Sequence, residues 1–101
     1  MNIDMESQFY ILLSLRTPEG FVTYGQYFFG NDRAAAYDLF NQLSGNSIIT
    51  DKSLLHIDLM ETEHDLPVKI KTVCCTLDEL AINSKHIART IFRLNNLKDI
   101  E

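Results

Sequence analysis

Hydrophobic and polar side chains alternate over residues 9–16, FYILLSLR, with the two-residue period of a β-strand. The turn sequence TPEG follows, and its Pro18 and Gly20 suit the backbone angles of a tight turn. A second alternating run, residues 21–29, then predicts the return strand of an antiparallel hairpin. Gly25 lies inside that run, and a glycine within a strand indicates a β-bulge or a close contact.

The pattern changes to a helical period in the next segment, NDRAAAYDLFNQL. Asn31 or Asp32 can cap its first turn, three consecutive alanines favour helix, and Gly45 suits the position after its end. Its apolar stripe consists of Ala36, Leu39, Phe40 and Leu43. Residues 8–45 are therefore predicted to form a strand–strand–helix unit.

Residues 53–95 repeat this order as a second unit. Residues 53–75 have the pattern of a hairpin with His64 and Asp65 at its tip. In the sequence TLDE that follows, Thr76 and Glu79 have the spacing of a capping box, which predicts the start of a helix. The apolar stripe of this helix consists of Leu77, Leu80, Ala81, Ser84, Ile87, Ala88, Ile91 and Leu94.

Corresponding positions of the two units lie 46 residues apart. The position of each turn sets the strand pairing of its hairpin, with Leu13 opposite Tyr24 in the first and Leu59 opposite Ile70 in the second. These two pairs lie at corresponding positions of the two units, and this agreement supports both registers. We therefore predict one domain over residues 1–101, an α+β two-layer sandwich with a tandem ββαββα order. Two helices would cover one face of a four-stranded antiparallel sheet whose strand order stays open. The predicted helix-facing strand residues are Phe9, Ile11, Leu13, Val22, Tyr24, Phe28, Leu55, Ile57, Leu59, Val68, Ile70 and Cys74.

Charge and composition narrow the possible partners. The net charge is −5, and neither half of the chain is basic, which weighs against duplex nucleic acid or an anionic membrane surface as a partner. The first residues, MNIDMESQ, lack the basic and apolar regions of a signal peptide, and no apolar run reaches the ~20 residues of a membrane span. We therefore expect a cytoplasmic protein with reduced cysteines.

The two adjacent cysteines are predicted to point to opposite faces of the sheet, Cys74 into the core and Cys75 away from the helices. The simplest interpretation is that both are small apolar strand residues. The alternative is a reactive Cys75 thiol near a helix N-terminus. There is no C-x-x-C motif and no second cysteine pair, so we predict neither a metal site nor a cofactor.

A low-ranked candidate for ligand binding or reactivity lies on the second hairpin. His56, Asp58, Lys71 and Cys75 would share the sheet face away from the helices, as in a Cys-His-Asp arrangement. That face is open to water, and Asp58 would already pair with Lys71 across the strands. We therefore predict no catalytic residue and keep an enzyme only as an alternative.

Three basic residues, Lys85, Arg89 and Arg93, are spaced four apart and form a ridge along the predicted last helix. This ridge is a candidate anion site, for a phosphate or an acidic partner. Its alternative interpretation is a solvated helix face.

Aromatic residues gather on the first hairpin, on the face predicted to lie away from both helices. These residues are Tyr10, Leu12, Phe21, Tyr27 and Phe29. Either one helix or the N-terminal segment covers them, or they form an interface, because exposed apolar surface and aromatic side chains are typical of binding sites. We favour the interface and predict a non-catalytic interaction module that forms a homodimer or binds another protein. The alternative is a small-ligand-binding or regulatory protein with a pocket at the subunit junction, anchored by His56, Lys69 or Lys71.

Overall fold

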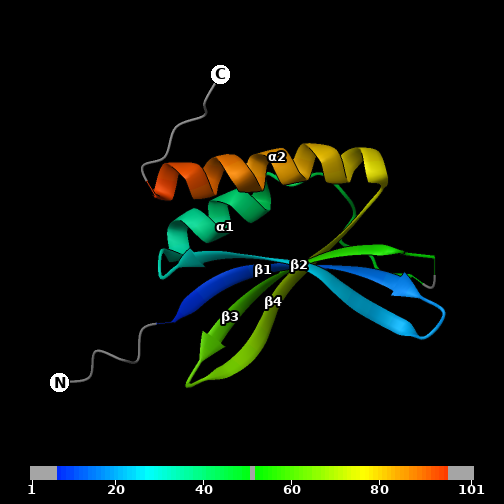
Figure 1. The fold of residues 1–101 in the computed structure, drawn as a ribbon, viewed down its shortest axis with the longest axis horizontal. Coiled ribbons are helices and arrows are strands. Elements are labelled where there is room, and N and C mark those ends of the chain that lie inside the picture. The colour runs from blue at the N-terminus through cyan, green and yellow to red at the C-terminus, as the bar shows by residue number, and fades with distance from the viewer. Residues whose placement is uncertain (1–6, 51, 96–101) are drawn as a thin grey trace.

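The computed structural model describes residues 7–50 and 52–95 and confirms the predicted fold class. The elements follow one another as β1 (Gln8–Thr17), β2 (Gly20–Gly30), α1 (Arg33–Asn41), β3 (Leu55–Glu63), β4 (Leu66–Cys75) and α2 (Leu77–Leu94). The strands form one antiparallel sheet in the order β2-β1-β3-β4, so the two hairpins are joined through β1 and β3. Both helices lie on the same side of the sheet (Figure 1).

Local sequence explains where these elements begin and turn. His64 and Asp65 join β3 to β4, and both have positive φ, as the central residues of a tight hairpin turn require. Asp32 caps α1 by accepting a hydrogen bond from the Ala35 N–H at 3.0 Å. The capping box of α2 is confirmed, because the Thr76 and Glu79 side chains each accept a hydrogen bond from the other residue's N–H.

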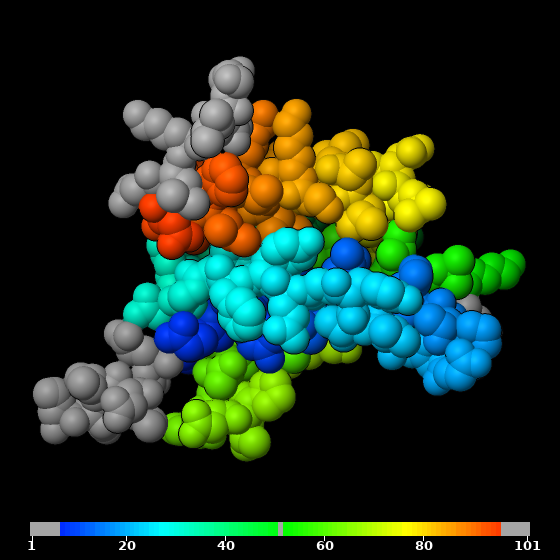
Figure 2. Space-filling model, viewed as in Figure 1, coloured from blue at the N-terminus to red at the C-terminus, as the bar shows by residue number. Residues whose placement is uncertain are grey.

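The core lies between the sheet and the helices. Its buried apolar residues are Phe9, Ile11, Phe29, Ala36, Leu39, Phe40, Ile57, Leu59 and Ile87. Burial of each large side chain among them contributes about 1.5–3 kcal/mol. In Figure 2, α2 lies above β2, and the tip of the β3–β4 hairpin extends below it.

The buried face of α2 differs from the predicted stripe. Leu77, Ala81 and Ala88 are exposed, whereas Asn83 and Thr90 are buried. Asn83 accepts a hydrogen bond from the Ser44 N–H at 2.7 Å and donates one to the Ser44 carbonyl at 2.9 Å. A polar side chain is buried here because the chain leaving α1 offers it two backbone partners, which hydrophobic periodicity does not reveal.

Two β-bulges set the faces of the hairpins. In the first hairpin, Ser14 pairs with Thr23 but Leu13 pairs with Gly25, so Tyr24 is an extra residue on β2. The bulge expected from Gly25 is therefore confirmed, whereas the predicted Leu13–Tyr24 pair is wrong.

The second bulge lies on β4. There, Met60 pairs with Lys69 but Leu59 pairs with Lys71, so Ile70 is the extra residue and the predicted Leu59–Ile70 pair is also wrong. An extra residue reverses the alternation of side chains beyond it, so the residues after Tyr24 and after Ile70 lie on the face opposite to the one predicted.

Several predicted core residues consequently lie elsewhere. Phe28 and Cys74 face away from the helices, because their partners Tyr10 and His56 do. Tyr24 is exposed at its bulge. Val22 and Val68 keep the predicted face but lie near the hairpin ends, where both are exposed. Leu13 and Ile70 pack against the core as predicted.

Candidate interaction surface

The sheet face opposite the helices, called the outer face below, carries a mixed aromatic and polar surface. Within residues 7–50 and 52–95, no helix or strand lies over it (Figure 1). Strand pairing places the following side chains on it: Tyr10, Leu12, Ser14, Arg16, Phe21, Thr23, Gln26, Phe28, His56, Asp58, Met60, Lys69, Thr72 and Cys74. The apolar side chains gather on β1 and β2, and the charged and polar ones on β3 and β4.

An aromatic cluster forms the β1–β2 half of the outer face. Phe28 stacks on Tyr10 with ring centroids 5.5 Å apart, although 61% of Phe28 is exposed. Phe21 is 44% exposed and lies under the Arg16 guanidinium, 4.8 Å from its ring centroid. Exposed aromatic surface of this kind is costly in water and is typical of contact sites.

Three of the five predicted interface residues, Tyr10, Leu12 and Phe21, lie on the outer face. The placement of the other two is wrong. Phe29 is 5% exposed in the core, and Tyr27 packs against that core from the helix side. The Tyr27 ring lies over Gly25, about 3.4 Å from the place a Cβ would take, so the glycine makes room for the ring. Phe28 and Gln26 lie on the outer face in place of Phe29 and Tyr27, because the bulge at Tyr24 reverses the alternation of side chains along β2.

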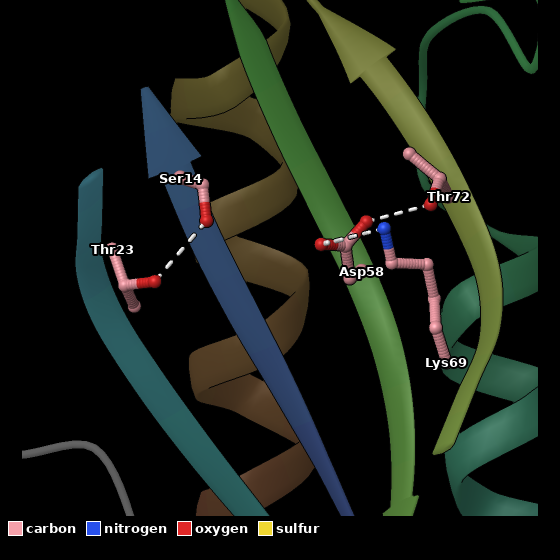
Figure 3. A network of polar contacts seen from close by, with 5 residues as sticks. All are labelled: Ser14, Thr23, Asp58, Lys69 and Thr72. Carbon is pink, nitrogen blue, oxygen red and sulfur yellow. Dashed lines mark hydrogen bonds and ion pairs between the residues drawn. The ribbon is translucent and has the colours of Figure 1, made fainter. Parts of the chain in front are cut away.

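Asp58 is the centre of the polar half (Figure 3). This buried carboxylate accepts a 2.6 Å hydrogen bond from the Thr72 hydroxyl, and the Lys69 ammonium lies 3.9 Å from its other oxygen. On the same face, the hydroxyl groups of Ser14 and Thr23 form a hydrogen bond 3.4 Å long. The contacts with Thr72 and Lys69 stabilise the buried carboxylate.

The predicted pair of Asp58 with Lys71 is wrong. Lys71 lies beyond the bulge at Ile70 and faces the helices, where it donates to the Asn41 side chain at 3.2 Å. Its ammonium also lies 5.6 Å from the Tyr37 ring centroid. Lys69, which is two residues nearer the β3–β4 turn, lies beside Asp58 instead.

His56 is buried on the outer face with one ring nitrogen unpaired. It is 8% exposed, its ring lies 4.3 Å from the Phe21 ring, and its Nε2 has no hydrogen-bond partner among the described residues. Burial lowers the pKa of His56, and Arg16 and Lys69 lower it further, whereas Asp58 opposes the change. The lowered pKa favours the neutral imidazole, whose Nε2 is a buried polar atom without a partner among the described residues.

The predicted constellation of His56, Asp58 and Cys75 is not assembled. Cys75 lies on the helix side beside Asn83, and burial raises the pKa of its thiol. Cys74 lies opposite His56 instead, but it is buried. Both cysteines are free thiols. Burial therefore disfavours the reactive thiolate form of Cys75, and this thiol and His56 lie on opposite faces of the sheet.

The anion ridge predicted on the last helix stays a prediction. Lys85, Arg89 and Arg93 are exposed on α2. In the described part of the chain, no three His, Cys, Asp or Glu side chains gather closely enough to hold a metal ion. Within the same residues, neither helix has the length and hydropathy needed to cross a membrane.

Comparison of the chain with family models, with curated proteins and with solved structures found no match. The case for a function therefore rests on the outer face and on the chemistry of its residues.

Proposed function

We propose that this protein is a non-catalytic interaction module that self-associates as a two-fold dimer through the outer face. The observation that carries the proposal is the stacked Tyr10–Phe28 pair, which lies on a sheet face without a covering helix and leaves Phe28 61% exposed. A partner that covers this pair removes apolar surface from water at about 25 cal/mol per Å².

A second copy of the chain suits this surface for two reasons. A two-fold axis through the aromatic half places Tyr10 and Phe28 against the same residues of the partner, and aromatic rings pack well against one another in offset or edge-on arrangements. The outer face carries charges of both signs, the carboxylate of Asp58 and the cationic groups of Arg16 and Lys69. Two copies that associate through this face would therefore not bring together surfaces of a single charge sign.

Association by the edge of β2 is a poorer alternative. The strand carries irregularities at Tyr24 and at Phe29, where pairing with β1 shifts register. Bulges of this kind bend an edge strand and interrupt the row of backbone groups that another strand would need. The face, rather than this edge, is the surface that a second copy would use.

Sedimentation equilibrium over a wide protein concentration range tests the proposal. Wild-type protein should approach twice the 11.6 kDa chain mass. Phe28→Lys should be monomeric at the same concentrations, because the interface would have to bury an unpaired ammonium. Ile82→Lys is the matched control, since Ile82 is also an exposed apolar residue but lies on α2. A wild-type monomer at all concentrations, or equal masses for the two variants, contradicts the dimer.

A small-ligand-binding protein is a second candidate, and the unpaired Nε2 of His56 favours it. A ligand at the subunit junction would pack flat apolar surface on Phe21. Because the nitrogen is buried, the Phe21 ring would have to shift before the ligand could hydrogen-bond to it. A thermal-shift screen tests it, because a ligand that binds the folded state raises the melting temperature. A hit whose shift persists in His56→Phe does not use this nitrogen. Either function is proposed to operate in the cytoplasm, where free thiols such as Cys74 and Cys75 stay reduced.

A further inference from the structure

A groove of about 680 Å³ lies beside β4, at the edge of the sheet away from the aromatic cluster. One wall is β4 itself, and the other is the end of α1 with the segment that follows it. Among the lining residues are Phe40, Leu43, Ile49, Lys69, Lys71 and Val73. The aromatic cluster of the outer-face proposal contributes no residue to this lining, although Lys69 and Thr72 belong to both the groove and the polar half of the outer face.

One backbone pairing at the end of the groove shows which groups of β4 are available. Asn46 and Cys74 exchange two backbone hydrogen bonds, both 2.8 Å long, in antiparallel geometry. The N–H and carbonyl of Cys74 therefore point away from β3. In an antiparallel strand, the N–H and carbonyl of one residue point to one side and those of the next residue point to the other side. The backbone groups of Thr72, two residues before Cys74, therefore also point away from β3 and into the groove.

The pairing with Asn46 stops after a single residue. The following segment turns away from β4, and Ile48 and Ile49 are exposed. The edge of β4 from Lys69 to Thr72 therefore has no strand beside it among the described residues. An extended peptide could continue the antiparallel pairing along this edge, as in other cases of strand addition.

Charge determines the kind of peptide. Lys69 and Lys71 line the groove and no acidic residue does, although the whole chain carries a net charge of −5. Asp58 lies 3.9 Å from the Lys69 ammonium on the outer face, whereas Lys71 contacts two neutral groups, the Asn41 amide and the Tyr37 ring. Two copies of β4 would bring like charges together, so a second copy of this chain is a poor occupant.

We propose that this groove binds an extended acidic segment of a partner protein, which adds to β4 as a fifth strand. Alternate side chains of the segment would be apolar and contact Phe40, Leu43 and Val73 on the helix side. Its carboxylates, on the opposite face of the added strand, would lie near the ammonium group of Lys69. The ammonium group of Lys71, on the helix side, would add to the positive potential of the groove. The backbone of Thr72 would supply one donor and one acceptor to the added strand.

The test uses a fluorescein-labelled eight-residue peptide of alternating glutamate and valine, with fluorescence anisotropy as the readout. Wild-type protein should bind it saturably, and binding should weaken as the salt is raised from about 0.05 to 0.3 M, since the contacts are ionic. The double variant Lys69→Glu, Lys71→Glu should bind at least about tenfold more weakly, a loss of roughly 1.4 kcal/mol. Lys85→Glu, Arg89→Glu changes the net charge equally on α2 and should bind as wild type does.

A backbone variant separates strand addition from simple charge attraction. Thr72→Pro removes the N–H that points into the groove and leaves the hydrogen bonds to β3, whereas Thr72→Ala removes only the hydroxyl that bonds Asp58. After circular dichroism confirms that both fold, the proline variant should bind the peptide several-fold more weakly than the alanine variant. Absence of saturable binding, equal binding by the two double variants, equal binding by the two Thr72 variants, or equal binding of a lysine–valine peptide overturns the proposal. None of these outcomes depends on dimer formation through the outer face.

Discussion

Tyr24 and Ile70 are each the extra residue of a β-bulge, and they lie 46 residues apart at corresponding places of the two hairpins. Each bulge reverses the faces of the strand residues that follow it. As a result Phe29 and Cys75 face the helices, whereas Phe28 and Cys74 face the other way. The bulges thereby place Phe28 in the aromatic half of the outer face, and Thr72 and Cys74 in the polar half.

Neighbouring phenylalanines provide a direct test of this assignment. Phe29→Ala should lower the free energy of unfolding by about 3–5 kcal/mol, because it removes a large side chain from the core. Phe28→Ala should lower it by only about 0.5 kcal/mol or less in the monomer, since Phe28 is mostly exposed. Urea denaturation at a concentration where the chain is monomeric measures both. If Phe28→Ala is the more damaging change, the alternation after Tyr24 is the reverse of that described.

The element order, the caps and the layer arrangement could be predicted from sequence because each depends on local signals. Thr76 and Glu79 are three residues apart, and alternation identifies the strands whichever face they bury. The face of each residue after a bulge could not be predicted in this way. Alternation carries no information on where one residue has been added, and a single addition reverses everything that follows.

One signal in the sequence could have located the first bulge. Gly25 interrupts an otherwise regular strand next to the extra residue Tyr24. A bulge placed there gives Phe28 and Gln26 their observed face, and the 46-residue correspondence then indicates a second bulge at Ile70. Burial of His56 and Asp58 on the face without helices has no such signal, because it depends on side chains from neighbouring strands.

Asn83 should be important for stability although it is polar. Asn83→Ala leaves the N–H and carbonyl of Ser44 without their partner and opens space at a fully buried position, so the free energy of unfolding should fall by about 1–3 kcal/mol. Asn95→Ala, at the exposed end of α2, is the control and should cost much less. Equal effects of the two changes in urea denaturation would show that the bond to Ser44 contributes little.

Cys75 should react slowly with thiol reagents at neutral pH. Burial raises its thiol pKa, which lowers the fraction of reactive thiolate. In a Cys74→Ser variant, which reports Cys75 alone, iodoacetamide should label the folded protein more slowly than it labels the same protein in urea. Labelling as fast as in the unfolded chain would show an accessible, activated thiol and would revive the enzyme alternative.

His56 should make stability depend on pH in a defined direction. Its pKa in the folded protein is lowered from the ordinary value of 6.5, so the unfolded chain binds the proton more readily. Well above pH 6.5 both states are neutral at this residue and it contributes no pH dependence. As the pH falls below 6.5 toward the folded-state pKa, the unfolded state gains protons first and the free energy of unfolding decreases; below the folded-state pKa the decrease stops.

Two histidine variants isolate this effect from the titration of carboxylates. His56→Gln removes the ionisation, so its free energy of unfolding should fall less than that of wild type between pH 8 and pH 5. His86→Gln, on the partly exposed side of α2, should follow the wild-type curve. Urea denaturation at each pH measures the difference. If His56→Gln and wild type lose the same stability over this range, the imidazole is not buried in its neutral form, and the case for an unpaired Nε2 as a ligand contact fails with it.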